Sequence, residues 1–106
     1  MLGFTYGDDE IRSTIQKVYE KTGYLCDPHG ACGYAALENT LKDNEWGIFL
    51  ETAHPAKFTA TMEQILGKGS VTLPEKLAAF MKGEKRVVQM DNRFDEFKTW
   101  LLKNGR

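Results

Sequence analysis

Residues 46–58 read WGIFLETAHPAKF, a short apolar run that leads into a polar turn and a proline. The run from Trp46 to Thr52 lacks the apolar–polar alternation of a half-buried strand, which is typical of a strand covered on both faces in a parallel sheet. Pro55 favours the first position of a helix, because its missing N–H is not needed there. The stretch therefore predicts a buried strand followed by a turn and a helix.

Helical patterns flank this stretch in the sequence. Before it, apolar residues recur at the three- and four-residue spacing of a helix face. Asp8 or Asp9 is expected to cap a first helix that ends at Gly23. Asp27 and Pro28 together favour the start of a second helix. Further helices are expected over 55–67, from Pro74 through Phe80, and after a cap at Asp91 or Asn92, with Phe94, Phe97 and Leu101 of this last helix facing inward. A second strand is expected at Lys85–Met90.

These elements predict an α/β fold in which about five helices surround two parallel strands. Two strands that are buried on both faces do not form an independent sheet, because sheets usually contain several strands. The shortage of strands favours a single unit, residues 1–106, that is a partial piece of a larger three-layer α/β/α domain. The alternative is that the strands borrow a neighbour from another chain.

Charge and composition exclude several classes of protein. The chain has 106 residues, of which 14 are Lys or Arg and 15 are Asp or Glu, so its formal net charge is −1. This balance argues against a nucleic-acid partner, which requires a basic cluster. The sequence contains neither a membrane-spanning run nor a secretory signal pattern, so no membrane partner is expected. The two cysteines are expected to be reduced thiols in a cytoplasmic protein.

Polar residues gather where the first predicted strand ends and a helix begins. Thr52 offers a hydroxyl, His54 an imidazole and Lys57 an amine. Ligands of open α/β sheets collect at the carboxyl ends of strands, and anions collect at helix N-termini. The alternative is an ordinary corner with a capping Thr or His and a solvated lysine. Lys57 is also a candidate for a Schiff-base lysine, although such a lysine needs burial and the sequence shows no sign of it.

The cysteines and histidines are candidate metal ligands. Cys26, His29 and Cys32, with His54 as a fourth ligand, have a spacing that is unusual for zinc. Buried thiols are the more common reason for such cysteines. The sequence therefore predicts no metal site.

Two motifs, in this order, resemble the carboxyl-terminal part of threonine synthase. Residues 23–37 fit G-Y-x-x-(D/E)-P-H-x-A-x-x-Y-x-A-L, and residues 52–58 read T-A-H-P-A-K-F. The ordered pair is much more specific than either motif alone. The Ile65-Leu66-Gly67 helix exit and the residues 73–77, LPEKL, also look like this family. The resemblance covers nearly the whole chain and only about the last quarter of a family member.

This resemblance implies a pyridoxal-phosphate-dependent lyase of the tryptophan-synthase β fold type, which converts O-phosphohomoserine and water into threonine and phosphate. The family's Schiff-base lysine and phosphate-cradling loop lie upstream, so it implies no catalytic residue in residues 1–106. Thr52 corresponds to the residue that approaches the pyridine nitrogen of the cofactor, and His54 is a second candidate on the cofactor side.

Two interpretations follow from the resemblance. In the first, the chain is a catalytically incomplete segment whose partner is the upstream part of the same enzyme. It then binds no pyridoxal phosphate alone and self-associates through surfaces that the upstream part would cover. In the second, the chain is a stand-alone, non-catalytic binding or accessory module derived from that fold, which folds by dimerising.

Overall fold

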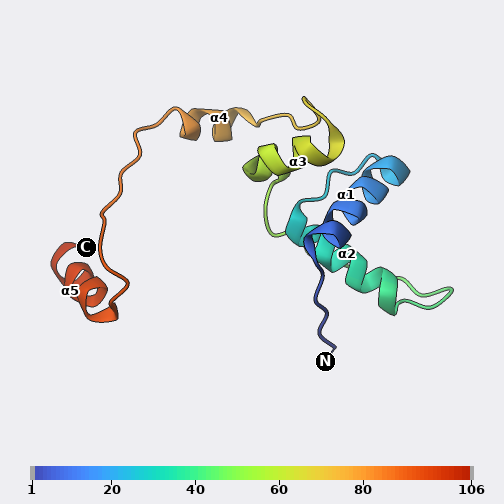
Figure 1. Cartoon of the computed structure of the whole chain (residues 1–106), viewed down its shortest axis with the longest axis horizontal. Coiled ribbons are helices and arrows are strands. Elements are labelled where there is room, and N and C mark those ends of the chain that lie inside the picture. The colour runs from blue at the N-terminus through green and yellow to red at the C-terminus, as the bar shows by residue number, and fades with distance from the viewer. Residues whose placement is uncertain (1, 106) are drawn as a thin grey trace. The chain divides into compact units, whose positions relative to one another are not determined.

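A computed structural model describes residues 2–105 and contains two compact units, Met1–Glu75 and Lys76–Arg106. The first unit holds the helices α1 (Asp8–Thr22), α2 (Pro28–Thr40) and α3 (Thr59–Leu66), together with the short 3-10 helix η1 (Pro55–Phe58). Helix α1 packs against both α2 and α3, as Figure 1 shows. None of the helices in residues 2–105 has the length and apolar character that crossing a membrane requires.

Helix α1 begins one residue earlier than the sequence predicts. Gly7 occupies the N-cap, and its N–H donates to Glu10 Oε2 at 2.8 Å, so Asp8 and Asp9 lie in the first turn instead of capping it. Acidic side chains are favourable there because the N-terminal end of a helix carries partial positive charge. The predicted end is confirmed: Gly23 adopts φ +72°, a left-handed conformation that glycine tolerates, and its N–H donates to Tyr19 O at 2.8 Å.

The core of the first unit lies where these helices meet. Its buried residues are Ile15, Val18, Cys26, Ala31 and Met62. Ile15, Val18 and Met62 are among the apolar residues whose helical spacing predicts a buried face. Helix α3 ends at Gly67, as expected, and is entered through η1 with Pro55 at its first position. The proline therefore starts a 3-10 turn that continues directly into α3.

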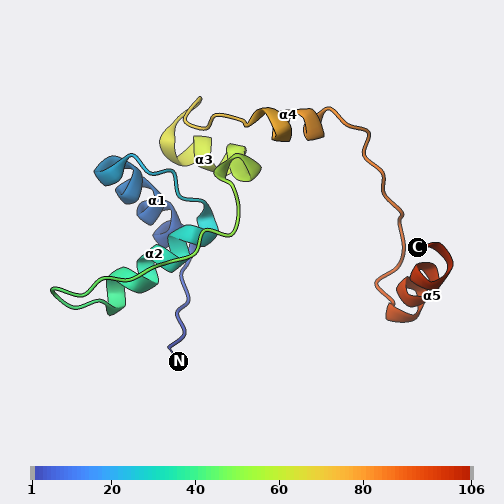
Figure 2. The ribbon, with the colours of Figure 1, turned by 180° about the vertical axis from the view of Figure 1, so that it is seen from behind.

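After α2 the chain reverses near residues 43–44 and returns along the helix in extended form. Figure 2 shows this segment running back across α2 towards α3. Three close approaches define its register: Gly47 lies against Leu37, Phe49 against Gly33, and Glu51 against Gly30. The helix residues are three and four apart and the segment residues are two apart, so one helix face meets one side of an extended chain.

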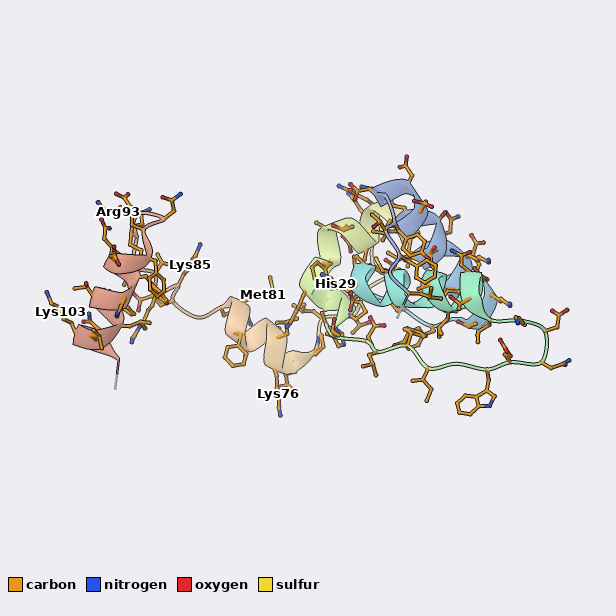
Figure 3. The ribbon with its side chains drawn as sticks, turned by 90° about the horizontal axis from the view of Figure 1, so that it is seen from below. His29, Lys76, Met81, Lys85, Arg93 and Lys103 are labelled. Carbon is orange, nitrogen blue, oxygen red and sulfur yellow. The ribbon has the colours of Figure 1, made fainter. Side chains whose placement is uncertain are left out.

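The other side of the extended segment is uncovered in this unit. Trp46, Ile48 and Leu50 alternate with the residues that face α2, and they are 82%, 74% and 78% exposed. Figure 3 shows side chains of the segment directed away from α2. Residues 46–50 therefore have one face packed on a helix and one apolar face open.

The predicted α/β fold is wrong for this structure, because residues 2–105 contain helices and no strand or sheet. A strand requires a ladder of hydrogen bonds to a neighbouring strand. Residues 46–52 are extended, but their neighbour is helix α2, which has no free backbone groups to offer. Residues 85–90 are also extended and exposed, without a paired backbone in the described chain.

The second unit contains all of α5 (Phe94–Asn104) and all but the first residue of α4 (Glu75–Met81). Arg93 occupies the N-cap position of α5, without a capping side-chain hydrogen bond, where the sequence predicts Asp91 or Asn92. Its predicted inward residues are exposed, with Phe94 at 73%, Phe97 at 44% and Leu101 at 42%. The spacing of apolar residues predicts this helix correctly, but in the described part of this unit nothing packs against its apolar face.

Candidate functional site

Asp27 is the fully buried side chain at the start of α2, with 0% exposure. Its Oδ1 accepts hydrogen bonds from the His29 N–H at 2.6 Å and the Gly30 N–H at 3.4 Å, and it lies 2.9 Å from His29 Nδ1. These contacts confirm Asp27 as the N-cap that the sequence predicts. The carboxylate also lies at the end of the helix where negative charge is stabilised.

The same residue holds the chain on both sides of Thr52. The Asp27 N–H donates to Glu51 Oε1 at 2.7 Å, and Asp27 Oδ2 accepts the Ala53 N–H at 3.2 Å. One bond therefore fixes the residue before Thr52 and the other fixes the residue after it. We call this arrangement of Asp27, Glu51 and Ala53 the Asp27 clamp.

Three groups surround the carboxylate of Glu51. Besides the Asp27 N–H, Tyr24 Oη donates to Glu51 Oε2 at 3.4 Å and Cys26 Sγ lies 3.7 Å from the same oxygen. The carboxylate lies above Gly30, where a methyl group would be 2.1 Å from Oε2. Only a residue without a side chain at position 30 leaves room for it.

The two carboxyl groups of the clamp influence each other's protonation. Burial would raise the pKa of Asp27, but hydrogen bonds from Glu51, His29 and Gly30 outweigh it and hold this pKa below its ordinary value. Burial is the main cause that raises the pKa of Glu51, and the Asp27 carboxyl group and its negative charge raise it further, while the bond from the Asp27 N–H lowers it. When the pair holds one proton, that proton therefore resides on Glu51.

Thr52, His54 and Lys57 do not converge on one point. Thr52 has an exposed side chain, and its hydroxyl makes no hydrogen bond within residues 2–105. His54 caps η1, since its Nδ1 accepts the Ala56 N–H at 3.1 Å, so the neutral ring carries its proton on Nε2. Lys57 is exposed on η1, as expected for a solvated lysine. The approach of Thr52 and His54 to a cofactor stays a prediction.

The cysteines and histidines that are candidate metal ligands make separate contacts. Cys26 and Cys32 are both free thiols. Cys32 Sγ donates to Pro28 O at 3.3 Å, and His29 faces Phe58 with ring centroids 5.3 Å apart, near α3 in Figure 3. In the described part of the chain, no three His, Cys, Asp or Glu side chains are grouped as metal ligands would be.

The sequence alone did not reveal the role of Glu51. The sequence predicts Asp27 as a helix cap, but it does not predict the bonds of Asp27 to Glu51 and Ala53, which lie 24 and 26 positions further along the chain. A signal was available: Gly30 and Gly33 lie three residues apart on one face of α2, and such small residues allow another backbone to approach closely. Gly47, Phe49 and Glu51 are spaced two residues apart, so they lie on one side of an extended segment, and that side meets the face of α2 that carries Gly30 and Gly33.

Comparison with known proteins identifies the family. The family model described as "Threonine synthase, C-terminal" matches residues 30–100, which include most of α2, the extended segment and η1. Threonine synthase of Haemophilus influenzae is 44% identical over 97 residues, which cover 92% of this chain and 22% of that protein. The Buchnera aphidicola enzyme from the host Acyrthosiphon pisum is 39% identical over 95 residues, or 90% of this chain and 22% of the relative. The Escherichia coli enzyme is 43% identical over 77 residues, or 73% of this chain and 18% of the relative.

The matching family model thus describes the carboxyl-terminal domain of an enzyme. The chain belongs to the threonine synthase family, which confirms the resemblance of its two motifs. It spans about a fifth of the length of the curated relatives it matches. No solved structure gives a significant match.

Proposed function

We propose that this chain is the carboxyl-terminal segment of a pyridoxal-phosphate-dependent threonine synthase and is catalytically incomplete by itself. The complete enzyme would convert O-phosphohomoserine and water into threonine and phosphate in the cytoplasm. The observation that carries the proposal is the Asp27 clamp, which fixes both neighbours of Thr52 while the Thr52 side chain stays exposed. A ligand-binding hydroxyl requires this combination of a fixed backbone and an accessible side chain.

Thr52 has the chemistry that the cofactor's pyridine nitrogen would meet. Its hydroxyl can donate one hydrogen bond and carries no charge. A neutral donor leaves the ring nitrogen unprotonated, whereas a carboxylate would favour its protonation. The cofactor supplies an electron sink for the reaction, and the contribution of this segment is to hold the ring and tune its nitrogen. His54 lies two residues further along, with its Nδ1 already engaged by Ala56, so we assign it to the shape of the corner.

The rest of the active site would come from the upstream part of the enzyme. The open side of the extended segment supports this, because Trp46, Ile48 and Leu50 form an apolar row that nothing in the first unit covers. Soluble proteins rarely leave such a row exposed unless it binds a partner. We assign the upstream part of the same enzyme as that partner, and we expect the chain alone to self-associate through this row.

The test uses a chimeric full-length enzyme in which residues 1–106 replace the matching segment of the Haemophilus influenzae threonine synthase. Thr52→Val keeps the shape of the side chain and removes its hydroxyl. The matched control is Thr72→Val, since Thr72 is also exposed and belongs to the same unit. Turnover of O-phosphohomoserine and the absorbance spectrum of the bound cofactor are measured for both variants.

We expect an active chimera in which Thr52→Val lowers turnover about tenfold or more and shifts the cofactor spectrum, while Thr72→Val changes neither. A tenfold loss corresponds to about 1.4 kcal/mol of transition-state stabilisation. A folded but inactive chimera would favour the stand-alone, non-catalytic module. Unchanged turnover and spectrum in Thr52→Val would remove Thr52 from the site.

A further inference from the structure

Glu51 precedes Thr52 directly and is the most constrained polar side chain of the extended segment. Its Oε1 accepts the Asp27 N–H at 2.7 Å, and its Oε2 faces Tyr24 Oη and Cys26 Sγ. These partners lie in the connection between α1 and α2 or at the cap of α2. The side chain therefore ties the extended segment to the start of that helix.

Glu51 also fits into a space that Gly30 leaves open. A methyl group at position 30 would lie 2.1 Å from Oε2, 2.6 Å from Cδ and 2.8 Å from Oε1 of Glu51. Such distances are far inside van der Waals contact, so any side chain at position 30 would expel the carboxylate. The height of the segment above α2 at this point is set by the contact between these two residues.

We infer that Glu51 is a positioning residue of the cofactor site: by occupying the space above Gly30 and accepting the Asp27 N–H, it sets where the Thr52 hydroxyl lies. This inference rests on the proposed function, in which that hydroxyl contacts the cofactor. Glu51 itself touches neither cofactor nor substrate in this scheme. It acts through the backbone of its neighbour.

The chemistry of the pair agrees with this role. Burial and the adjacent Asp27 raise the pKa of Glu51, so a proton between the two carboxyl groups resides on Glu51. A protonated Glu51 can still accept the Asp27 N–H through Oε1, while Oε2, which faces Tyr24 Oη and Cys26 Sγ, carries the proton. A glutamine side chain has the same shape as a protonated glutamate, and like it has one oxygen that accepts and one group that donates hydrogen bonds. Glu51→Gln should therefore preserve the positioning, whereas Glu51→Ala should abolish it.

The experiment uses the same chimeric holoenzyme with Glu51→Ala, Glu51→Gln and Gly30→Ala. Gly30→Ala removes no polar or charged group from the chain; it only displaces the Glu51 carboxylate from the space above position 30. Glu63→Ala is the matched control, because Glu63 Oε1 also accepts one backbone N–H, that of Gly69 at 2.9 Å, away from the site. The measurements are kcat, KM for O-phosphohomoserine and the absorbance spectrum of the bound cofactor.

We expect Glu51→Ala and Gly30→Ala to lower kcat by about as much as Thr52→Val does, on the order of tenfold, with KM nearly unchanged, because a displaced hydroxyl loses at most the interaction that Thr52→Val deletes. Both should shift the cofactor spectrum in the same direction as Thr52→Val, while Glu51→Gln and Glu63→Ala keep the parent values. If Glu51→Ala unfolds the enzyme, Gly30→Ala decides, since alanine favours the helix.

Two results would overturn the inference. If Thr52→Val impairs the enzyme but Gly30→Ala leaves kcat and the spectrum unchanged, Glu51 does not position Thr52, and the proposed function stands. If Glu51→Gln is as damaging as Glu51→Ala, its shape and hydrogen bonds are not what matters. Failure of the proposed function looks different, because Thr52→Val itself would then have no effect.

Discussion

Gly30 and Glu51 share one space: a methyl group on Gly30 would lie 2.1 Å from Glu51 Oε2. Helix α2 and the extended segment after it can approach each other here only because position 30 lacks a side chain. This contact joins the two motifs of the family, since Gly30 lies in the first and Glu51 directly precedes the second.

The first prediction is that the effect of Gly30→Ala on stability changes sign with the residue at position 51. In the parent chain we expect Gly30→Ala to lower the free energy of unfolding by on the order of 1 kcal/mol, because loss of the Glu51 bonds outweighs the gain in helix propensity. In a Glu51→Ala background the space is free. There Gly30→Ala should raise the free energy of unfolding by roughly 0.5–1 kcal/mol.

Urea unfolding of the four chains in this double-mutant cycle measures the coupling. Additive effects of the two substitutions would show that Gly30 and Glu51 do not compete for space.

The second prediction concerns Asp27, whose buried carboxylate accepts the N–H groups of His29, Gly30 and Ala53. Asp27→Ala leaves these donors without their acceptor, and we expect a loss of about 2–3 kcal/mol in the free energy of unfolding. Asp27→Asn keeps one acceptor oxygen and should cost about half as much. Urea denaturation of the 106-residue chain checks both values. Equal losses for Ala and Asn would show that the charge, and not the acceptor, is what stabilises the cap.

The third prediction is a pH dependence from the two carboxyl groups. The pKa of Glu51 is raised above its ordinary value of 4.5, so its contribution to stability is complete below pH 4.5 and is lost as pH rises through the raised pKa. The pKa of Asp27 is lowered from 3.8, so its contribution is lost as pH falls through the lowered pKa. The charged or titratable groups facing Glu51 are Asp27, Tyr24 and Cys26.

Glu51→Gln cannot ionise, so its free energy of unfolding should increase relative to the parent chain as pH rises above 4.5. Urea unfolding between acid and neutral pH measures this difference. The control is Glu63→Gln, which removes a carboxylate outside the clamp. A constant difference between Glu51→Gln and the parent would contradict the raised pKa.

The fourth prediction is that the two thiols differ in reactivity. Cys26 is fully buried, and burial together with Glu51 raises its pKa to about 12. The thiolate is the reactive form, so Cys26 should be almost inert near neutral pH in the folded chain. Cys32 is only partly buried and should react first. Titration with a disulfide reagent should find one fast thiol in the native chain, two in urea, and none fast in Cys32→Ser.

Local chemistry made much of the first unit predictable from sequence. Asp27 with Pro28 and the glycines at 23 and 67 mark helix ends by backbone rules that act within a few residues. The state of residues 46–52 was not predictable in this way. An apolar run without alternation is compatible with burial on two faces, but whether it forms a strand depends on a second backbone elsewhere in space.

The candidate site shows the same division. Thr52 and His54 could be named because they lie in a motif, and the capping role of His54 follows from its place before Pro55. The clamp could not be named, because the contacts of Asp27 with Glu51 and Ala53 join positions more than 20 residues apart. The sequence signal of such a contact is a pair of glycines on one helix face, here Gly30 and Gly33, together with alternate residues of a later extended segment that pack against them.

The fifth prediction concerns the apolar row Trp46, Ile48 and Leu50. If this row is the surface that the upstream part of the enzyme covers, the isolated chain should self-associate through it and bind an apolar dye. Leu50→Lys should shift the chain towards a monomer in light scattering, because a charge within an apolar contact is costly. Leu102→Lys is the matched control, since Leu50 and Leu102 are both 78% exposed and only Leu50 belongs to the row.

Trp46 reports on the same surface without disturbing it. Trp100→Phe leaves Trp46 as the single indole, which is 82% exposed in the first unit. Its emission should move to shorter wavelength as the chain concentration rises and in the chimeric full-length enzyme, where the upstream part excludes water from the row. Adding Leu50→Lys should abolish the concentration-dependent shift, and Leu102→Lys should not. An indole that stays fully hydrated in the chimera would show that the upstream part does not cover this face.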